Sequence, residues 1–425
     1  MSLRVSLGEV HVLVVVGVVV AVPCCLRVEK KAELIDSETL SHLKSYKYSS
    51  VDKSYISNYI LRHYWNYCAS LMPLWLAPNV ITLIGLIFIY INVLCILIYV
   101  PDLVGPGPSW LYFSFGAGLW LYSTMDNIDG KQARRTGSSS PLGELFDHGI
   151  DSLNCTLGGL IETACMGLGP TRTGAFITMV SCLAMFFSTW ETYHTHTLYL
   201  GYFNGPTEGI IIAVGLMIIS GIYGPEIWQK TLLDILPVLS FLPARVGNTP
   251  LRDVFATIVA LAFFTAHLPF CVYNVYEARK SRHQPFLPTL KEWVPFVWSA
   301  LSVYIWLDSP YSVLLSENHL VLFALATSFS FGRVTTKIIL AHLTKQPFPY
   351  WTILVVPVYI APLLFYWLPS LGVTLFTGQF ELLYLWSYAI FSFTYFMAWA
   401  RVVINAICDY LGINCFTIKT SAKAD

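Results

Sequence analysis

Four aspartates with regular spacing stand out in a chain that is otherwise strongly apolar. Asp126 and Asp129 are three residues apart, and Asp147 and Asp151 are four apart. Either spacing places two side chains on one face of a helix. A carboxylate next to hydrocarbon costs roughly 2.5–3.5 kcal/mol on insertion scales, so a cluster of four requires a functional explanation. Four hard oxygen donors suit Mg²⁺, Mn²⁺ or Ca²⁺ rather than zinc, and two such ions form a clamp for in-line displacement at phosphorus.

The elements that must position these carboxylates are two apolar segments, expected at residues 108–126 and 142–165. The first aspartate pair follows the end of one segment, and the second pair lies at the start of the other. The sequence SSSP, ending at Pro141, marks a turn between them. A helical hairpin is therefore expected to bring both pairs together at a membrane boundary.

Small and basic residues surround the aspartates. Gly130, Ala133 and Gly143 would allow a bulky ligand, or the facing helix, to approach the backbone closely. Arg134 and Lys131 suit the neutralisation of phosphate, although both also fit ordinary flanking charge at a membrane surface.

A candidate general base lies inside the same motif. Glu144 and His148 form an i,i+4 pair, and a carboxylate that orients an imidazole raises its basicity. Asp151 is the rival base if it does not commit both oxygens to metal. The structural alternative for His148 is a hydrogen bond that merely supports a ligand.

Composition identifies a polytopic membrane protein. Of 425 residues, 56% are hydrophobic and only 12% are charged, against about 25% charged in soluble domains. The net charge of zero gives no reason to expect nucleic acid as a partner. We predict an all-α fold with about ten transmembrane helices, at residues 79–100, 108–126, 142–165, 173–190, 208–224, 252–276, 292–312, 318–342, 351–374 and 381–407. The scattered cysteines indicate neither a disulfide framework nor a zinc site.

The N-terminal part divides into two segments. Residues 1–40 are expected to be an extension of uncertain role; a cleaved signal and a weak anchor remain open for its valine-rich start. Residues 41–75 are aromatic and mixed in charge, which predicts an interfacial amphipathic helix around 52–70, with a solvated linker helix as the alternative. Residues 76–225 would then be the catalytic helices, 226–410 a lipid chamber and dimer surface, and 411–425 a cytosolic tail.

Positive charge orients the chain in the membrane. If the Lys- and Arg-rich segment before the first span is cytosolic, alternation of about ten spans places Lys131, Arg134 and Arg135 on the same side. The acidic motif is therefore expected to face the cytosol.

The complete pattern D-x2-D-G-x2-A-R-x8-G-x3-D-x3-D resembles the signature of the CDP-alcohol phosphatidyltransferases. The surrounding GKQARRT and PLGELFDHGIDS are similar to the eukaryotic choline/ethanolamine phosphotransferase branch. The resemblance extends to LAPNVIT at 76–82, STWETYHTHTLYLG at 188–201 and GPTEGI at 205–210.

This resemblance implies an activity. Such enzymes transfer phosphocholine or phosphoethanolamine from CDP-choline or CDP-ethanolamine to diacylglycerol, release CMP, and act as homodimers among the membrane lipids of the endoplasmic reticulum or Golgi. It also implies two Mg²⁺ or Mn²⁺ ions and roles for individual residues. Metal ligands would be Asp126, Asp129 and Asp147, with Asp151 as a further ligand or alternative base and Glu144 with His148 as the favoured base pair. CDP-alcohol contacts would come from Asn79, Gly130, Ala133, Arg134 and Gly143.

A quaternary ammonium prefers aromatic faces, and the end of the fourth span offers candidate head-group contacts in Trp190, Glu191 and Tyr193. An aromatic belt at the membrane interface is the structural alternative. Glu208 either joins this polar layer or caps a solvated helix N-terminus. Choline and ethanolamine are not distinguished.

Three other functions compete. A relative with a different alcohol or lipid acceptor would have fewer spans. A cation-coupled transporter predicts acids near mid-membrane and paired repeats, which the sequence lacks. A lipid-binding scaffold that has lost catalysis would be expected to lack at least one of the four acids.

Overall fold

The computed structural model describes residues 37–241 and 243–419. Most of the expected N-terminal extension, residues 1–40, lies outside the described residues, as does the end of the expected cytosolic tail. The described chain forms two compact units. One holds residues up to Tyr46 together with Leu287–Gly412, and the other holds Lys47–Phe286 together with the residues from Ile413 onward.

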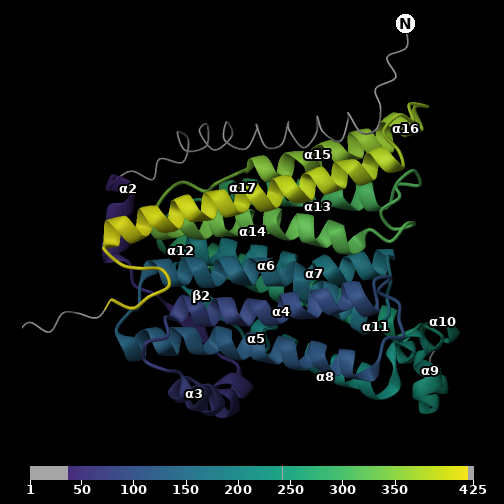
Figure 1. Ribbon diagram of the computed structural model, residues 1–425, viewed down its shortest axis with the longest axis horizontal. Coiled ribbons are helices and arrows are strands. Elements are labelled where there is room, and N and C mark those ends of the chain that lie inside the picture. The colour runs from purple at the N-terminus through teal and green to yellow at the C-terminus, as the bar shows by residue number, and fades with distance from the viewer. Residues whose placement is uncertain (1–36, 242, 420–425) are drawn as a thin grey trace, which may run out of the picture. The chain divides into compact units, whose positions relative to one another are not determined.

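The unit with the acidic motif is a bundle of long helices joined by short helical and extended segments. Its longer helices are α3 (Arg62–Leu71), α4 (Pro78–Tyr99), α5 (Ser109–Thr136), α6 (Pro141–Cys165), α7 (Arg172–Thr195), α8 (Ile210–Tyr223), α11 (Leu251–Ala262) and α12 (Leu268–Ser281). Its short elements are η2 (Ser57–Leu61), η3 (Gly205–Gly209), η4 (Pro225–Gln229), α9 (Leu232–Ile235), η5 (Pro237–Phe241), α10 (Ala244–Gly247) and η6 (Phe263–His267). Figure 1 shows α4 to α8 running side by side, and α4 packs on both α5 and α6.

The second unit is also helical, and its main contact joins α14 to α17. Its elements are α2 (Ser37–Ser41), η1 (His42–Ser45), η7 (Leu287–Trp293), α13 (Val294–Leu307), α14 (Leu320–Thr344), η8 (Ile353–Val355), α15 (Val356–Pro362), η9 (Leu363–Trp367), α16 (Leu368–Ser370) and α17 (Gln379–Leu411). A fully buried Arg333 of α14 lies over the ring of Trp399 of α17, with 4.2 Å from the guanidinium carbon to the ring centroid.

All ten segments expected to span the membrane contain helix. Within the described residues, six helical segments are both long and apolar enough to cross a membrane: Pro78–Tyr99, Arg172–Thr195, Gly205–Tyr223, Leu251–Ser281, Ile353–Ser370 and Gln379–Leu411. They support an integral membrane protein, whereas the count of ten is not confirmed. Among the others, α13 has only 14 residues, and α5 and α6 carry the charges of the acidic motif.

Local sequence explains the hairpin between α5 and α6. Gly137 ends α5 in the left-handed conformation, with φ of 64°, which glycine adopts at little cost. Ser140 then caps α6 by accepting a hydrogen bond from the backbone N–H of Gly143, and Pro141 occupies the first helical turn. The predicted turn is therefore confirmed.

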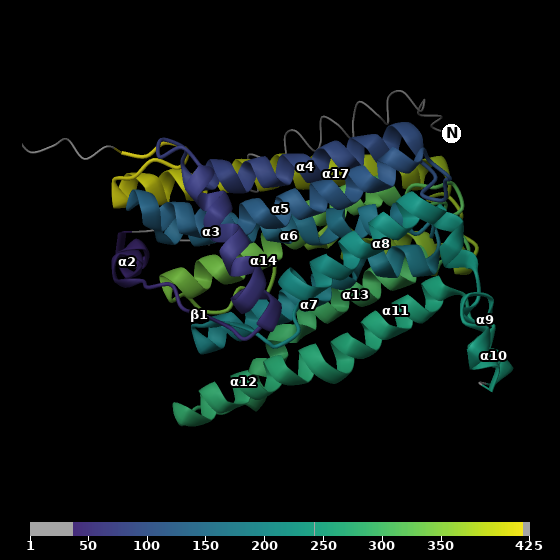
Figure 2. The ribbon, with the colours of Figure 1, turned by 90° about the horizontal axis from the view of Figure 1, so that it is seen from below.

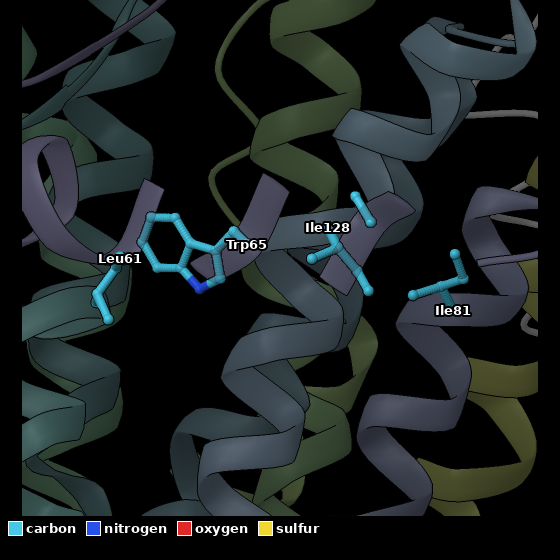
Figure 3. Close-up of a cluster of buried hydrophobic side chains, with 5 residues drawn as sticks. Leu61, Trp65, Ile81 and Ile128 are labelled. Atoms are coloured by element: carbon cyan, nitrogen blue, oxygen red, sulfur yellow. The ribbon is translucent and has the colours of Figure 1, made fainter. Parts of the chain in front are cut away.

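The predicted helix around residues 52–70 is largely confirmed as η2 and α3. Figure 2 shows α3 lying across α5 rather than along it. Leu61 and Trp65 pack with Ile81 and Ile128 in one buried cluster (Figure 3). Ile128 directly precedes Asp129. The packing of this amphipathic segment on Ile128 therefore positions α5 next to the acidic motif.

A short parallel strand pair precedes this segment. Ser50–Asp52 (β1) pairs with Leu198–Leu200 (β2), with Val51 opposite Tyr199. The buried Glu208 accepts hydrogen bonds from the Ser54 hydroxyl and from the Asn204 backbone N–H, so it fastens this strand to the start of α8. The all-helical expectation did not include this pair.

Close packing of α6 on α7 depends on one glycine. A Cβ at Gly159 would lie 2.5 Å from the carbonyl oxygen of Thr178 and 2.7 Å from that of Ile177. Both atoms belong to the backbone of α7, so neither can move without shifting the helix. The neighbouring Gly158 has room, because its Cβ would meet only Asn154 Oδ1 at 3.7 Å.

Gly159→Ala should therefore lower the free energy of unfolding by about 1–3 kcal/mol, as overpacking does. Gly158→Ala is the matched control and should be neutral or slightly stabilising, since alanine favours helix over glycine. Thermal unfolding in detergent measures both. Equal midpoints for the two variants would contradict the close contact between α6 and α7.

Candidate active site

The α5–α6 hairpin brings the four aspartates into one cluster, as their spacing predicts. Asp126, near the end of α5, is within hydrogen-bonding contact of Asp147 and Asp151, both near the start of α6. Asp129 contacts Asp147 in the same way. Carboxylates in such contact repel one another unless protons or cations neutralise them.

Neighbouring helices hold two of these carboxylates in place. The Thr82 hydroxyl of α4 donates to Asp129 Oδ2, and the Tyr122 hydroxyl, one turn before Asp126 on α5, donates to Asp151 Oδ1. Neither Thr82 nor Tyr122 was singled out from the sequence. Their spacing could have indicated them. Thr82 lies one helical turn after Asn79, and Tyr122 lies four residues before Asp126, so each shares a helix face with a residue of the predicted site.

The donor set fits a divalent cation. Ligand atoms of Asp147, His148 and Asp151 all lie within 4.8 Å of one another. Asp147 Oδ1 is buried and has no hydrogen-bond partner in the described chain. A buried carboxylate oxygen without a partner is costly, and a hard cation would satisfy it. Together with the facing aspartates of α5, this oxygen identifies where Mg²⁺ or Mn²⁺ could be held.

His148 contacts Asp151, with 3.4 Å between its Nδ1 and Oδ2, and its side chain is 14% exposed. Glu144 is close enough to act electrostatically on the imidazole. Both oxygens of Asp151 thus have neighbours on the protein, one being Tyr122 and the other His148. An imidazole beside a carboxylate is a suitable proton acceptor, and its Nε2 remains available for a substrate.

The residues expected to contact the CDP-alcohol border the same cluster. Asn79 Oδ1 lies 3.8 Å from the position that a Cβ of Gly143 would take, and an Arg134 nitrogen lies 3.6 Å from that of Gly130. These are ordinary contacts, so neither glycine is required by the facing helix. The small residues were expected to admit either a bulky ligand or the facing helix, and these contacts favour the ligand. Ala133 lies beside Arg134, which is exposed.

Two basic residues near the motif donate hydrogen bonds to α3 and to the residue that follows it. Lys131 Nζ donates to Asn66 Oδ1 of α3 at 2.8 Å. Arg135 donates to the carbonyl oxygens of Ala69 and Met72 at the end of α3. These contacts agree with a structural role for Lys131 and leave Arg134 as the exposed cation of the motif.

The candidate head-group residues lie at the end of α7. Trp190 is fully buried and packs edge-on against Phe187. Glu191 is 3% exposed, and its Oε1 accepts a hydrogen bond from Asn274 of α12 at 2.6 Å. Tyr193 contacts the ring of His194. Glu191 thus joins α7 to α12, whereas the ring contact of Trp190 with Phe187 lies within α7. Of the two alternatives for Glu208, the solvated helix N-terminus is wrong, because that residue is only 6% exposed.

Tyr48, just before β1, is a neighbour of the cluster that the sequence did not indicate. Although 54% of its surface is exposed, desolvation by the surrounding protein raises its pKa to about 12, and the charges of Asp147, Glu144 and Asp126 add to the rise. A hydrogen bond with Ser50 opposes this shift. The hydroxyl therefore stays protonated at physiological pH and can donate to an anionic ligand. The pairing of β1 with β2, just after Tyr48, joins segments distant in sequence, so local sequence patterns could not indicate this position.

Comparison with known proteins agrees with this site. Residues 75–242 match the family model described as CDP-alcohol phosphatidyltransferase. The chain is similar to choline/ethanolaminephosphotransferase 1 of Arabidopsis thaliana, with 37% identity over 90% of this chain and 98% of the relative. It is 39% identical to cholinephosphotransferase 1 of Saccharomyces cerevisiae over 74% and 80% of the two chains. Ethanolaminephosphotransferase 1 of Mus musculus is 31% identical over 76% and 81%. The chain therefore belongs to the CDP-alcohol phosphatidyltransferase family.

Proposed function

We propose that the protein transfers phosphocholine or phosphoethanolamine from CDP-choline or CDP-ethanolamine to diacylglycerol, with release of CMP. The observation that carries this proposal is the cluster of four aspartates, in which the buried Asp147 Oδ1 has no hydrogen-bond partner in the described chain. The names of the relatives identify the substrate class: choline, ethanolamine, or both.

The aspartates would serve as the ligands of two divalent ions. Asp126, Asp129 and Asp147 are the proposed ligands, and Asp151 completes the set or exchanges a proton with His148. When bound, Mg²⁺ or Mn²⁺ neutralises the pyrophosphate and stabilises CMP as the leaving group. Thr82 and Tyr122 hold two of the carboxylates by hydrogen bonds, so the ligand set is oriented before substrate arrives.

His148 is the proposed base. Its imidazole would take the proton of the diacylglycerol hydroxyl as the oxygen attacks the phosphorus next to the alcohol. The bond from that phosphorus to the oxygen of CMP breaks in the same displacement. Asp151 and Glu144 stabilise the imidazolium that forms, while Arg134 offers a guanidinium to the phosphate.

The location of the site suits the two substrates. The donor is a charged nucleotide from water, and the acceptor is a lipid from the bilayer, so both meet only at a membrane boundary. We propose that this boundary is the cytosolic face of the endoplasmic reticulum or Golgi membrane and that the enzyme acts as a homodimer. Trp190, Glu191 and Tyr193 stay candidates for the head-group side, where Glu191 already holds Asn274.

The purified protein, supplied with diacylglycerol, Mg²⁺ and one CDP-alcohol, should release CMP and form phospholipid. His148→Ala should lower kcat by about 10²- to 10⁴-fold, the usual contribution of a general base, without losing Mn²⁺ affinity. If Asp151 is a metal ligand, Asp151→Asn should lower both kcat and the affinity for Mn²⁺. If the wild-type protein is folded and binds metal but is active with neither CDP-choline nor CDP-ethanolamine, the proposed function is contradicted.

Asp147→Asn should have opposite effects with and without metal. Without metal the variant should unfold at a higher temperature than the wild type, because one negative charge has left a repelling cluster. At about 100 Kd of Mn²⁺ the wild type should gain about 2.7 kcal/mol of stability, and the variant much less. Asp253→Asn, outside the cluster, is the control. Equal metal stabilisation in all three proteins would exclude Asp147 as a ligand.

The orientation of the α5–α6 hairpin across the membrane can be tested by glycosylation. The turn at residues 137–140 precedes α6, whereas Pro225 lies against Gly167, just beyond the other end of α6. The two connections thus lie at opposite ends of this helix. An acceptor sequence inserted between η4 and α11 should be glycosylated in the lumen, and one inserted in the α5–α6 turn should not. The reverse pattern would place the aspartates in the lumen.

A further inference from the structure

The segment that follows α17 returns to the unit that holds the aspartates. Helix α17 ends at Leu411, and the next residue, Gly412, turns the chain with a φ of 66°. From Ile413 onward the chain groups with Lys47–Phe286. Within the segment, Asn414 Nδ2 donates to Thr417 Oγ1 at 2.9 Å, which shapes a local turn.

Three contacts join this segment to the borders of the aspartate cluster, one of them from Asn79 Nδ2 to Cys415 Sγ at 3.5 Å. Asn79 Nδ2 donates to the carbonyl oxygen of Cys415 at 3.0 Å, across 336 residues of sequence. The ring of Phe416 meets that of Phe146 edge-on, with 5.7 Å between their centroids. Phe146 directly precedes Asp147, and Asn79 lies beside Gly143.

The contact with Cys415 decides which way the amide of Asn79 points. A backbone carbonyl accepts hydrogen bonds and donates none, so the NH₂ group of Asn79 must face it. The amide oxygen is then turned toward Gly143 at the start of α6, and no donor for it is recorded in the described chain. This orientation presents a hydrogen-bond acceptor, rather than a donor, to a ligand beside the motif.

We propose that residues Ile413–Lys419 form part of the nucleotide site. In this proposal the Cys415 carbonyl orients Asn79 to accept a hydrogen bond from an amino or hydroxyl group of the cytidine, and Phe416 braces Phe146. Asn79 is the contact residue, and the C-terminal segment is a positioning element. The proposal rests on the proposed function only in taking a cytidine nucleotide as the ligand.

The variants separate this role from a general effect on folding. One ends the chain at Gly412, and its matched control ends at Lys419, so only the control keeps the segment. Phe416→Ala removes one contact. Cys415→Ala removes only the longer contact of Asn79 with Sγ, at 3.5 Å, and retains the backbone carbonyl, so it should bind CMP nearly as the wild type does. Asn79→Ala, alone and combined with the shorter truncation, completes a double-mutant cycle.

CMP binding by calorimetry, thermal unfolding and steady-state kinetics are measured on each variant. The truncation at Gly412 should weaken CMP binding and raise the KM for CDP-choline or CDP-ethanolamine about tenfold, with the KM for diacylglycerol and Mn²⁺ affinity unchanged. In a protein that already carries Asn79→Ala, the truncation should weaken CMP binding little further, because both changes remove the same contact. Phe416→Ala should act in the same direction.

Other outcomes separate the two proposals. Unchanged CMP affinity in the truncated protein, or losses that simply add to that of Asn79→Ala, would overturn the role of the segment, whatever the activity. A wild type that binds CMP but turns over neither CDP-alcohol would contradict the proposed function; a weaker CMP affinity after truncation would still support the segment's role. A wild type that does not bind CMP would overturn both.

Discussion

Repulsion among four clustered, partly or fully buried carboxylates is the constraint on which the rest of this structure depends. Asp126, Asp129, Asp147 and Asp151 lie close enough to act on one another electrostatically, in a chain of which only 12% is charged. No arrangement of helices gains stability by collecting these groups without neutralising them. The cluster is therefore explained by what it binds, and the surrounding fold supplies the free energy that holds it together.

Packing away from the aspartates supplies that free energy. Gly159 allows α6 to lie against the backbone of α7, and Leu61 of η2 and Trp65 of α3 pack against α5. Hydrogen bonds from Thr82 and Tyr122 then fix individual carboxylates. Since each of these contacts comes from a different helix, the carboxylates are held in place from several sides, and Asp147 Oδ1 is left without a hydrogen-bond partner in the described chain. Such preorganisation is what transfer of a phosphoryl group requires from a protein.

Local sequence rules predicted the parts of this site that lie close together in the chain. The three- and four-residue spacings, the SSSP turn and the apolar runs predicted the α5–α6 hairpin and the helical segments. They did not predict contacts between distant segments, because periodicity carries no information on which segments meet. The β1–β2 pair that holds Tyr48, the bond from Glu191 to Asn274 and the return of Cys415 to Asn79 are all of that kind. Glu208 was ambiguous for the same reason, since its partner Ser54 lies in a distant segment.

The central claim is that cations held by the four carboxylates contact the pyrophosphate of the donor. The most direct test replaces one non-bridging oxygen of that pyrophosphate in CDP-choline or CDP-ethanolamine with sulfur. Mg²⁺ binds sulfur poorly, whereas softer ions such as Cd²⁺ accept it. The account predicts that one diastereomer reacts slowly with Mg²⁺ and regains its rate when Cd²⁺ is added. Equal slowing with both metals, for both diastereomers at either phosphorus, would contradict a direct contact between metal and substrate.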